Sequence, residues 1–138
     1  NKMSNGITYL KAFTTQINRF LSDLVVIFPE ERQIRMYKNS IEMVKIVNPR
    51  KIMEGFTYYI FPYKTQIENH DERFFMEQKY DDIIDEYSID KNSKEDNLVE
   101  ALALKKLWKN LDQDKKDIIW KYFEVLIKIV ERDAMLNK

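Results

Sequence analysis

This 138-residue sequence contains no cysteine, only two glycines, three prolines and a single histidine. Without cysteine the chain can form neither disulfides nor thiolate zinc sites, which suits a reducing intracellular setting. Folds built from many strands and tight turns need more glycine and proline than this, whereas helix bundles do not. No apolar run is long enough to span a bilayer, and the start, NKMSNGITYL, has no secretory h-region. These absences favour an all-α intracellular protein without a membrane span.

The single histidine also limits the possible chemistry. Most hydrolytic triads, histidine-ligated metals and histidine proton shuttles are confined to His70, which we interpret as a surface or capping residue. Phosphate-binding loops need clustered glycines, and Gly6 and Gly55 are isolated. Glu-x-x-His pairs, which di-iron bundles use, are absent as well. The sequence therefore predicts no enzymatic activity, no cofactor and no metal.

The residues that are present have a globular balance, with 44% hydrophobic and 33% charged side chains. The length is that of one domain, so we expect residues 1–138 to form a single helical domain. Within 112–136 a helical pattern is apolar almost all round, broken mainly by Lys121, Glu124 and Lys128 in one narrow stripe. Trp120 in this stretch should be buried. The predicted fold class is all-α: a single-domain bundle of five to six helices around a hydrophobic C-terminal helix, residues 114–134.

Apolar residues three and four apart predict the helices of the first half. The first should run from about residue 8 to residue 27, where Phe28-Pro29 ends it and Pro29 opens the second. Asn48-Pro49 predicts the start of a third helix, and Pro62 should end or kink it.

In the second half, Asp71 is expected to cap a short helix that contains Phe74 and Phe75. The polar stretch 88–97, SIDKNSKEDN, is predicted to be the longest loop and mobile. A further single helix is predicted over about 94–110, before the C-terminal helix.

Charge is unevenly placed although the net charge is zero. Residues 1–64 carry a balance of +5, residues 65–100 a balance of −8 and residues 101–138 a balance of +3. The densest carboxylate group comprises Asp81, Asp82, Asp85 and Glu86. It fits either a solvated acidic helix face or a docking surface for a basic partner.

Aromatic side chains number 18, and the densest run is residues 58–63. Helical spacing cannot bury all of its rings on one face, so some either contact neighbours on two sides or form an exposed contact patch. Tyr58, Phe61 and Tyr63 are therefore candidate partner-binding residues, with core filling as the alternative. We expect these rings to anchor a partner while the acidic residues orient it.

A second functional possibility comes from basic residues in the first half of the chain. Arg32, Arg35, Lys38, Arg50 and Lys51 could contact phosphates, which makes a nucleic-acid-associated regulatory factor the alternative function. These residues do not form a continuous basic stripe in the sequence, so a nucleic-acid partner is less favoured than a protein.

Three short motifs resemble small uncharacterised helical proteins of nucleocytoplasmic large DNA viruses. They are Phe28-Pro29, the run Glu72-Arg73-Phe74-Phe75, and Leu107-Trp108-Lys109 followed by Ile119-Trp120-Lys121-Tyr122. The resemblance implies a host cytoplasmic or virion location and supplies no catalytic residues. Together with the residue patterns, it leads us to expect a non-enzymatic protein-interaction or structural component of a large DNA virus particle or replication compartment.

Overall fold

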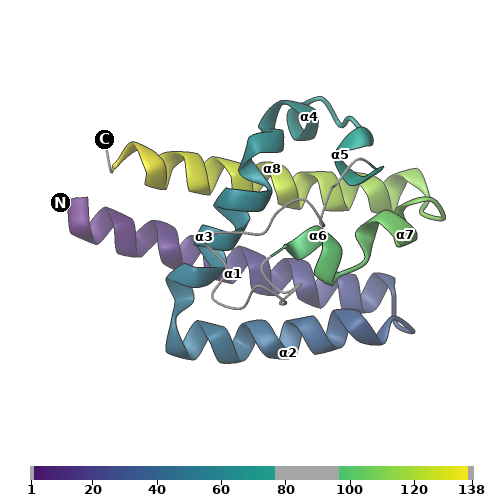
Figure 1. Cartoon of the computed structure of the whole chain (residues 1–138), viewed down its shortest axis with the longest axis horizontal. Coiled ribbons are helices and arrows are strands. Elements are labelled where there is room, and N and C mark those ends of the chain that lie inside the picture. Colours follow the sequence, from purple (N-terminus) through teal and green to yellow (C-terminus); the bar gives the residue numbers. More distant parts are fainter. Residues whose placement is uncertain (1, 77–96, 137–138) are drawn as a thin grey trace.

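The computed structural model describes residues 2–76 and 97–136, and every regular element in these two ranges is a helix (Figure 1). The four long helices are α1 (Lys2–Ile27), α2 (Arg32–Val47), α3 (Pro49–Tyr59) and α8 (Gln113–Met135). The short elements are a 3-10 turn (Phe61–Tyr63), α4 (Lys64–Glu68), α5 (Arg73–Met76), α6 (Leu98–Ala101) and α7 (Leu104–Trp108). The predicted all-α class is confirmed.

The long helices α8, α1 and α2 run roughly along the long axis of the molecule, with α1 in the middle and α3 crossing them (Figure 1). Helix α1 contacts α2, α3 and α8, whereas α8 packs mainly on α1 and α4. One side of α8 is exposed to solvent, at Ile118, Lys121 and Lys128. The N-terminal helix, which buries residues such as Phe13, Phe20 and Leu24, therefore links the other long helices.

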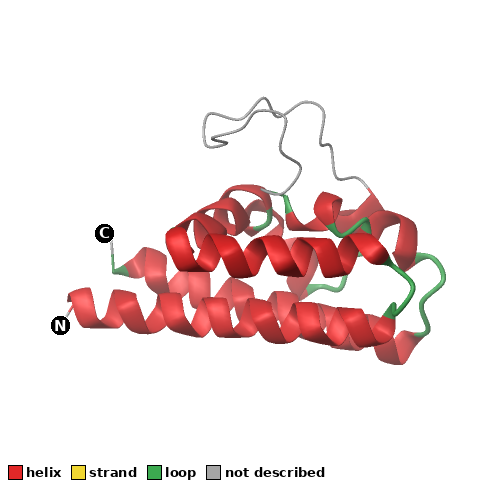
Figure 2. Ribbon diagram, turned by 90° about the horizontal axis from the view of Figure 1, so that it is seen from below, coloured by secondary structure: helices red, strands yellow, loops and turns green. Residues whose placement is uncertain are grey.

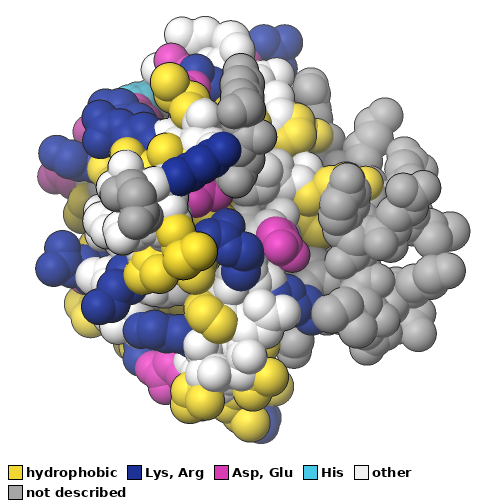
Figure 3. All heavy atoms as spheres, turned by 90° about the vertical axis from the view of Figure 1, so that its left-hand side faces the viewer, with side chains coloured by type: hydrophobic (Ala, Val, Ile, Leu, Met, Phe, Trp, Pro, Cys, Tyr) yellow, Lys and Arg dark blue, Asp and Glu magenta, His cyan; other side chains and the backbone are white. Residues whose placement is uncertain are grey.

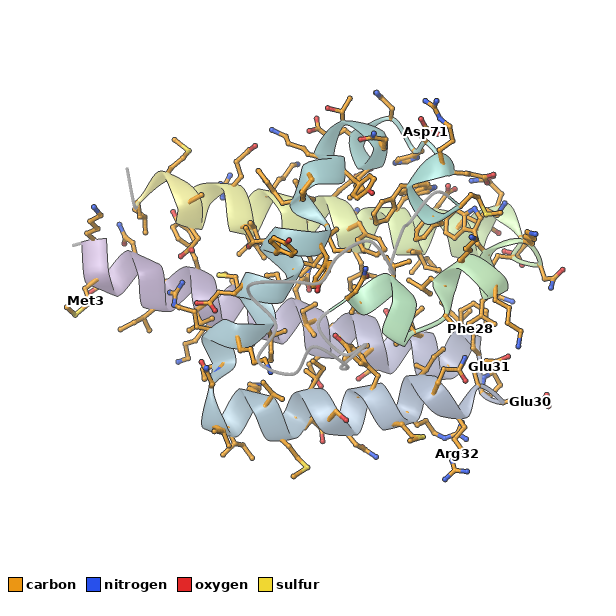
Figure 4. The ribbon with its side chains drawn as sticks, in the orientation of Figure 1. Met3, Phe28, Glu30, Glu31, Arg32 and Asp71 are labelled. Atoms are coloured by element: carbon orange, nitrogen blue, oxygen red, sulfur yellow. The ribbon has the colours of Figure 1, made fainter. Side chains whose placement is uncertain are left out.

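The turn between α1 and α2 differs from the prediction. Helix α1 ends at Ile27 as expected, although it begins at Lys2 and not near residue 8 as predicted. Helix α2 begins at Arg32, so the prediction that Pro29 opens this helix is wrong. Phe28 packs against the core, and the Phe28 N–H still donates to the Leu24 carbonyl at 2.8 Å. Arg35 Nη1 donates to the Pro29 carbonyl at 2.6 Å, which holds Pro29 in the turn, outside the helix. Figure 4 shows Glu30 and Glu31 in this turn.

Two other predicted helix boundaries are confirmed. Helix α3 begins directly after Asn48 with Pro49 at its first position, although the Asn48 side chain makes no capping hydrogen bond. Helix α3 ends at Tyr59, before Pro62, and the chain continues as a 3-10 turn. Farther on, Asp71 Oδ1 accepts a hydrogen bond from the Arg73 N–H at 3.0 Å at the start of α5. Proline stereochemistry and side-chain capping are local effects, which is why these boundaries could be read from the sequence.

The prediction of one continuous helix over 94–110 is wrong within the described residues. The chain forms α6 and α7 instead, and Ala103 between them has a left-handed backbone with φ 55°. At about 100° per residue, one helix would spread the buried residues of this stretch around its whole circumference. The break lets the following residues all reach the core: Leu98, Val99, Leu102, Leu104, Leu107 and Trp108.

The loop predicted over 88–97 falls almost entirely on residues 88–96, which lie outside the described residues. Its last residue, Asn97, is buried, and the Asn97 side chain accepts a hydrogen bond from the Val99 N–H at 3.1 Å. Asn97 is therefore a fixed part of the start of α6.

Replacing Ala103 with glycine should stabilise the protein. A left-handed backbone brings the alanine Cβ too close to a carbonyl oxygen, and glycine has no Cβ. We expect Ala103→Gly to raise the free energy of unfolding by about 0.5–1 kcal/mol in chemical denaturation. Ala12→Gly, at an exposed position inside α1, is the matched control and should lower the free energy by about 1 kcal/mol. Equal destabilisation by both changes would contradict the left-handed conformation at Ala103.

Candidate functional site

The aromatic candidates Tyr58, Phe61 and Tyr63 are neither fully buried nor fully exposed. Phe61 and Tyr63 pack partly against the core, and the Tyr63 ring lies 5.4 Å from the Phe74 ring. The Tyr58 ring meets the edge of its neighbour Tyr59 at 4.9 Å. Helix α3 ends between Tyr58 and Phe61, so the three rings do not share one helix face. Their contact with a partner stays a prediction.

The acidic candidates Asp81, Asp82, Asp85 and Glu86 lie outside the described residues. Within residues 2–76 and 97–136, no three carboxylate or histidine side chains are grouped so that they could hold a metal ion.

The basic residues of the alternative function are divided between the two ends of α2. Arg32 and Arg35 lie at its start, while Arg50 and Lys51 follow its end. Sixteen helical residues extend about 24 Å, so these ends cannot contact the same phosphate group. Lys38 pairs with Glu42 at 2.8 Å, and Arg50 reaches Asp133 at 3.4 Å. The fold does not assemble the five cations into one phosphate-binding surface.

His70 lies on an aromatic cluster. Its ring is parallel to the Trp120 ring at 5.1 Å, and Nε2 interacts with a carboxylate oxygen of Glu124. His70 has φ 50°, a left-handed conformation that histidine adopts more readily than most residues. Beneath it, the rings of Phe74, Phe75, Trp108, Trp120 and Phe123 contact one another. As expected for a surface histidine, the His70 side chain is partly exposed.

A second charged pair, Lys116 and Glu72, lies next to the Trp108 ring of this cluster. Lys116 Nζ lies 2.9 Å from the Glu72 carboxylate and 5.2 Å from the centre of the Trp108 ring. The Lys116 ammonium holds the pKa of Glu72 below its usual range. The Trp108 indole N–H is buried without a hydrogen bond of ordinary geometry in the described residues, although Glu72 is near enough for an electrostatic interaction. The rings of this cluster pack against one another in the core, so we assign the cluster a structural role.

Helix α2 carries apolar side chains on two opposite faces. Ile34, Tyr37 and Ile41 point into the core. Met36, Met43 and Val47 follow one another at spacings of seven and four, which places them on a single outward stripe. Their side chains are 56%, 71% and 85% exposed. Figure 2 shows α2 in front, with no other helix over this outer side. We call these three residues the α2 stripe.

Beside the α2 stripe lies a groove of about 420 Å³ between α1 and α2, here called the α1–α2 groove. It is lined by Thr14, Asn18, Ile41, Glu42, Lys45, Ile46 and Ile52. Thr14, Ile41 and Ile52 are buried and form its floor, while Ile46, 84% exposed, projects at its rim next to the α2 stripe. Figure 3 faces the end of the molecule where α2 stops and shows hydrophobic side chains beside Lys and Arg.

A smaller groove of about 360 Å³ lies between α1 and α8. The Tyr122 hydroxyl hydrogen-bonds to the Asp23 carboxylate in this groove. Burial, with a further contribution from Asp23, raises the pKa of Tyr122 to about 12, so the phenol stays protonated at neutral pH. Only one large hydrophobic side chain here, Ile118, is strongly exposed. Unlike the α1–α2 groove, this groove has no stripe of exposed methionine and valine side chains beside it among the described residues.

The α2 stripe was not predicted from the sequence, because the core-facing residues of α2 explained the apolar periodicity of this helix. The signal was nevertheless present: Met36, Met43 and Val47 repeat at helical spacing out of phase with Ile34, Tyr37 and Ile41. An apolar pattern on two opposite faces means that the helix is either enclosed or exposed to a partner. The sequence does not say which, because it does not show what packs on α2.

Comparison with known proteins found no matching family model, no matching curated protein and no matching solved structure. No helix in the described part of the chain combines the length and the hydrophobicity needed to cross a membrane.

Proposed function

We propose that this protein is a non-enzymatic protein-interaction or structural component, and that it contacts its partner through the α2 stripe. The observation that supports this proposal is the second apolar face of α2. Single exposed apolar residues are common on monomers, but aligned ones on an uncovered helix present apolar surface whose burial would favour association. Here that surface is interrupted between Met36 and Met43 by Asn39 and Ser40. Methionine suits such a surface because its flexible side chain adapts to a partner.

A nucleic-acid-associated regulatory factor is the alternative. The basic character of α2 favours it, since this helix has four basic residues and one acidic residue. Two observations speak against it. Phosphate binding does not need an exposed stripe of Met and Val side chains, and the cations at the two ends of α2 are far apart. The protein partner is therefore the better supported of the two.

We also propose that this protein is a component of a large DNA virus particle or replication compartment. The support for this assignment is the resemblance carried by Phe28-Pro29, Glu72–Phe75 and the two Trp-Lys motifs. The aromatic residues of these motifs, Phe28, Phe74, Phe75, Trp108 and Trp120, pack in or against the core. Core packing alone accounts for these aromatic residues. The resemblance therefore bears on the source of the protein more than on its contact surface.

Polar substitution of the α2 stripe should remove partner capture without affecting the fold. We expect Met43→Ser with Val47→Ser to lose at least about 90% of specifically captured protein, because a partner would lose its apolar anchors. The melting temperature should stay nearly unchanged, since both side chains are already in solvent. The measurement is affinity capture from the cell that produces the protein, quantified by mass spectrometry.

The matched control is Met3→Ser with Val26→Ser, which changes the same residue types where they are 76% and 78% exposed. Met3 lies at the start of α1 (Figure 4), and Val26 lies in the last turn of this helix. The control should retain capture. Equal capture by both double variants and the wild type would reject the α2 stripe as the contact surface.

A further inference from the structure

We propose that the α1–α2 groove, together with the α2 stripe beside it, binds an acidic amphipathic helix of the partner. This inference rests on the proposed function and adds the chemistry of the segment that is recognised. Three features support it: the apolar floor and rim, the charge of the surrounding residues, and the absence of a sheet edge in the described part of the chain.

The apolar part of the surface is long enough for about three helical turns. From Met36 to Val47 it extends about 16 Å along α2. Ile46 projects between the stripe and the groove, so a partner helix that packs on Ile46 borders both. Such a helix needs apolar anchors at spacings of three, four and seven residues.

The occupant is a helix because nothing in the described residues can pair with an extended chain. Residues 2–76 and 97–136 contain only helices and turns, whose backbone offers no free sheet edge. A segment that enters an apolar groove must still satisfy its own backbone hydrogen bonds. A helix does this internally, and an extended peptide does not.

The charge around the groove selects an acidic partner. Lys45 lines the groove, and Lys11 lies on α1 one turn before Thr14; neither has an ion-pair partner among the described residues. Glu42 is the one acidic residue of the lining, and Lys38 neutralises it. Arg32 and Arg35 at the start of α2 are offset by Glu30 and Glu31 in the preceding turn, so the excess positive charge comes from Lys11 and Lys45. Carboxylates along the edges of a bound helix would compensate this excess.

A second copy of the chain fits the surface poorly for the same reason. A parallel pair of α2 helices would place Arg32 beside Arg32, and an antiparallel pair would place Arg32 and Arg35 near Lys45. Each helix contributes only one carboxylate, Glu42, which is already paired. Like charges facing each other oppose self-association.

Panning a phage-displayed library of random 16-residue peptides against the full chain tests this inference without assuming the occupant's charge. We expect the enriched peptides to be net negative, with apolar residues at i, i+4 and i+7. The tightest synthetic peptide is then titrated by fluorescence anisotropy. Ile46→Ser should weaken its binding by about tenfold or more. Lys11→Glu with Lys45→Glu should weaken it by about tenfold and reduce its salt dependence.

Two matched controls separate local effects from general ones. Val26→Ser removes an exposed valine elsewhere, and Lys105→Glu with Lys106→Glu reverses two exposed lysines on α7. Both should bind the peptide within about twofold of the wild type, because neither changes the α1–α2 groove.

Several outcomes would overturn the proposal. These are a failure to enrich any peptide, enrichment of neutral or basic peptides, or binding that Ile46→Ser leaves unchanged. A wild-type dimer in sedimentation that Ile46→Ser converts to monomer would assign the surface to a second copy. Tighter binding of a 20-nucleotide single strand than of any peptide, lost in Lys11→Glu with Lys45→Glu, would assign it to nucleic acid. If stripe variants lose capture but the peptides are not acidic, this inference fails and the proposed function stands.

Discussion

Trp120→Ala should lower the free energy of unfolding by about 3–5 kcal/mol, the cost of removing a large aromatic side chain from a packed core. Trp120 is only 2% exposed, as the sequence predicted. Its ring lies 5.1 Å from Phe75, 5.2 Å from Trp108 and 5.1 Å from His70. Truncation would leave a cavity between α8 and the short helices α5 and α7, which are too short to be stable without this packing. Chemical denaturation monitored by far-UV circular dichroism measures the change.

Ile118→Ala provides a control two residues earlier on the same helix. Ile118 is 42% exposed, so its truncation should change the free energy of unfolding by no more than about 0.5 kcal/mol. A loss below about 1 kcal/mol for Trp120→Ala would mean that the tryptophan is not enclosed by these neighbours.

Phe123→Ala should be comparably destabilising, by about 3–5 kcal/mol, because one ring joins four elements. Phe123 is fully buried. Its ring centre lies 5.5 Å from Phe20 on α1, 6.4 Å from Phe56 on α3 and 5.2 Å from Phe74 on α5. The contacts with Phe20 and Phe74 are edge-to-face and the contact with Phe56 is stacked. Aromatic pairs of these kinds add about 0.5–1.5 kcal/mol each beyond the burial of area. The free energy of unfolding in urea measures the effect.

Two further variants make this prediction testable even if Phe123→Ala does not fold. Phe123→Leu keeps most of the volume and should cost less than about 2 kcal/mol. Phe61→Ala removes the same side chain at a half-buried position and should cost less than half as much as Phe123→Ala. A larger loss at Phe61 than at Phe123 would reverse the burial order that the structure gives.

Much of the fold could be predicted from local features of the sequence. Asn48-Pro49 marked the start of α3, and Pro62 marked the region where this helix ends. Asp112 caps α8 through a hydrogen bond from the Lys115 N–H at 2.9 Å. These signals operate within one turn of the chain, because proline stereochemistry and side-chain capping depend on neighbouring residues alone.

The errors arose where packing overruled a local pattern. Residues 98–108 contain strong helix formers, yet the helix breaks at Ala103 because six apolar side chains must face one core. Pro29 is a favourable first residue for a helix, but Arg35 holds its carbonyl in a turn. In both cases the helix boundary depends on contacts with residues outside the short sequence pattern from which it was predicted.

The candidate contact surface depends even more on packing, which the local sequence does not show. The sequence drew attention to Tyr58, Phe61 and Tyr63, and the fold leaves these rings half-buried. It gave no reason to single out Met36, Met43 and Ile46, and its periodicity placed Val47 on the buried side of α2, but all four are strongly exposed. Exposure depends on which helices cover α2, and this information is not contained in the periodicity of α2 itself.

The sequence alone therefore determined the all-α class, most helix boundaries and the burial of Trp120, because hydrophobic periodicity and backbone stereochemistry act locally. Only the tertiary structure decided that α1 links the long helices, that His70 lies on Trp120 beside Glu124, and that one face of α2 remains uncovered. These features depend on how segments far apart in the chain meet. The same apolar pattern is core where another helix packs on it and a contact surface where none does.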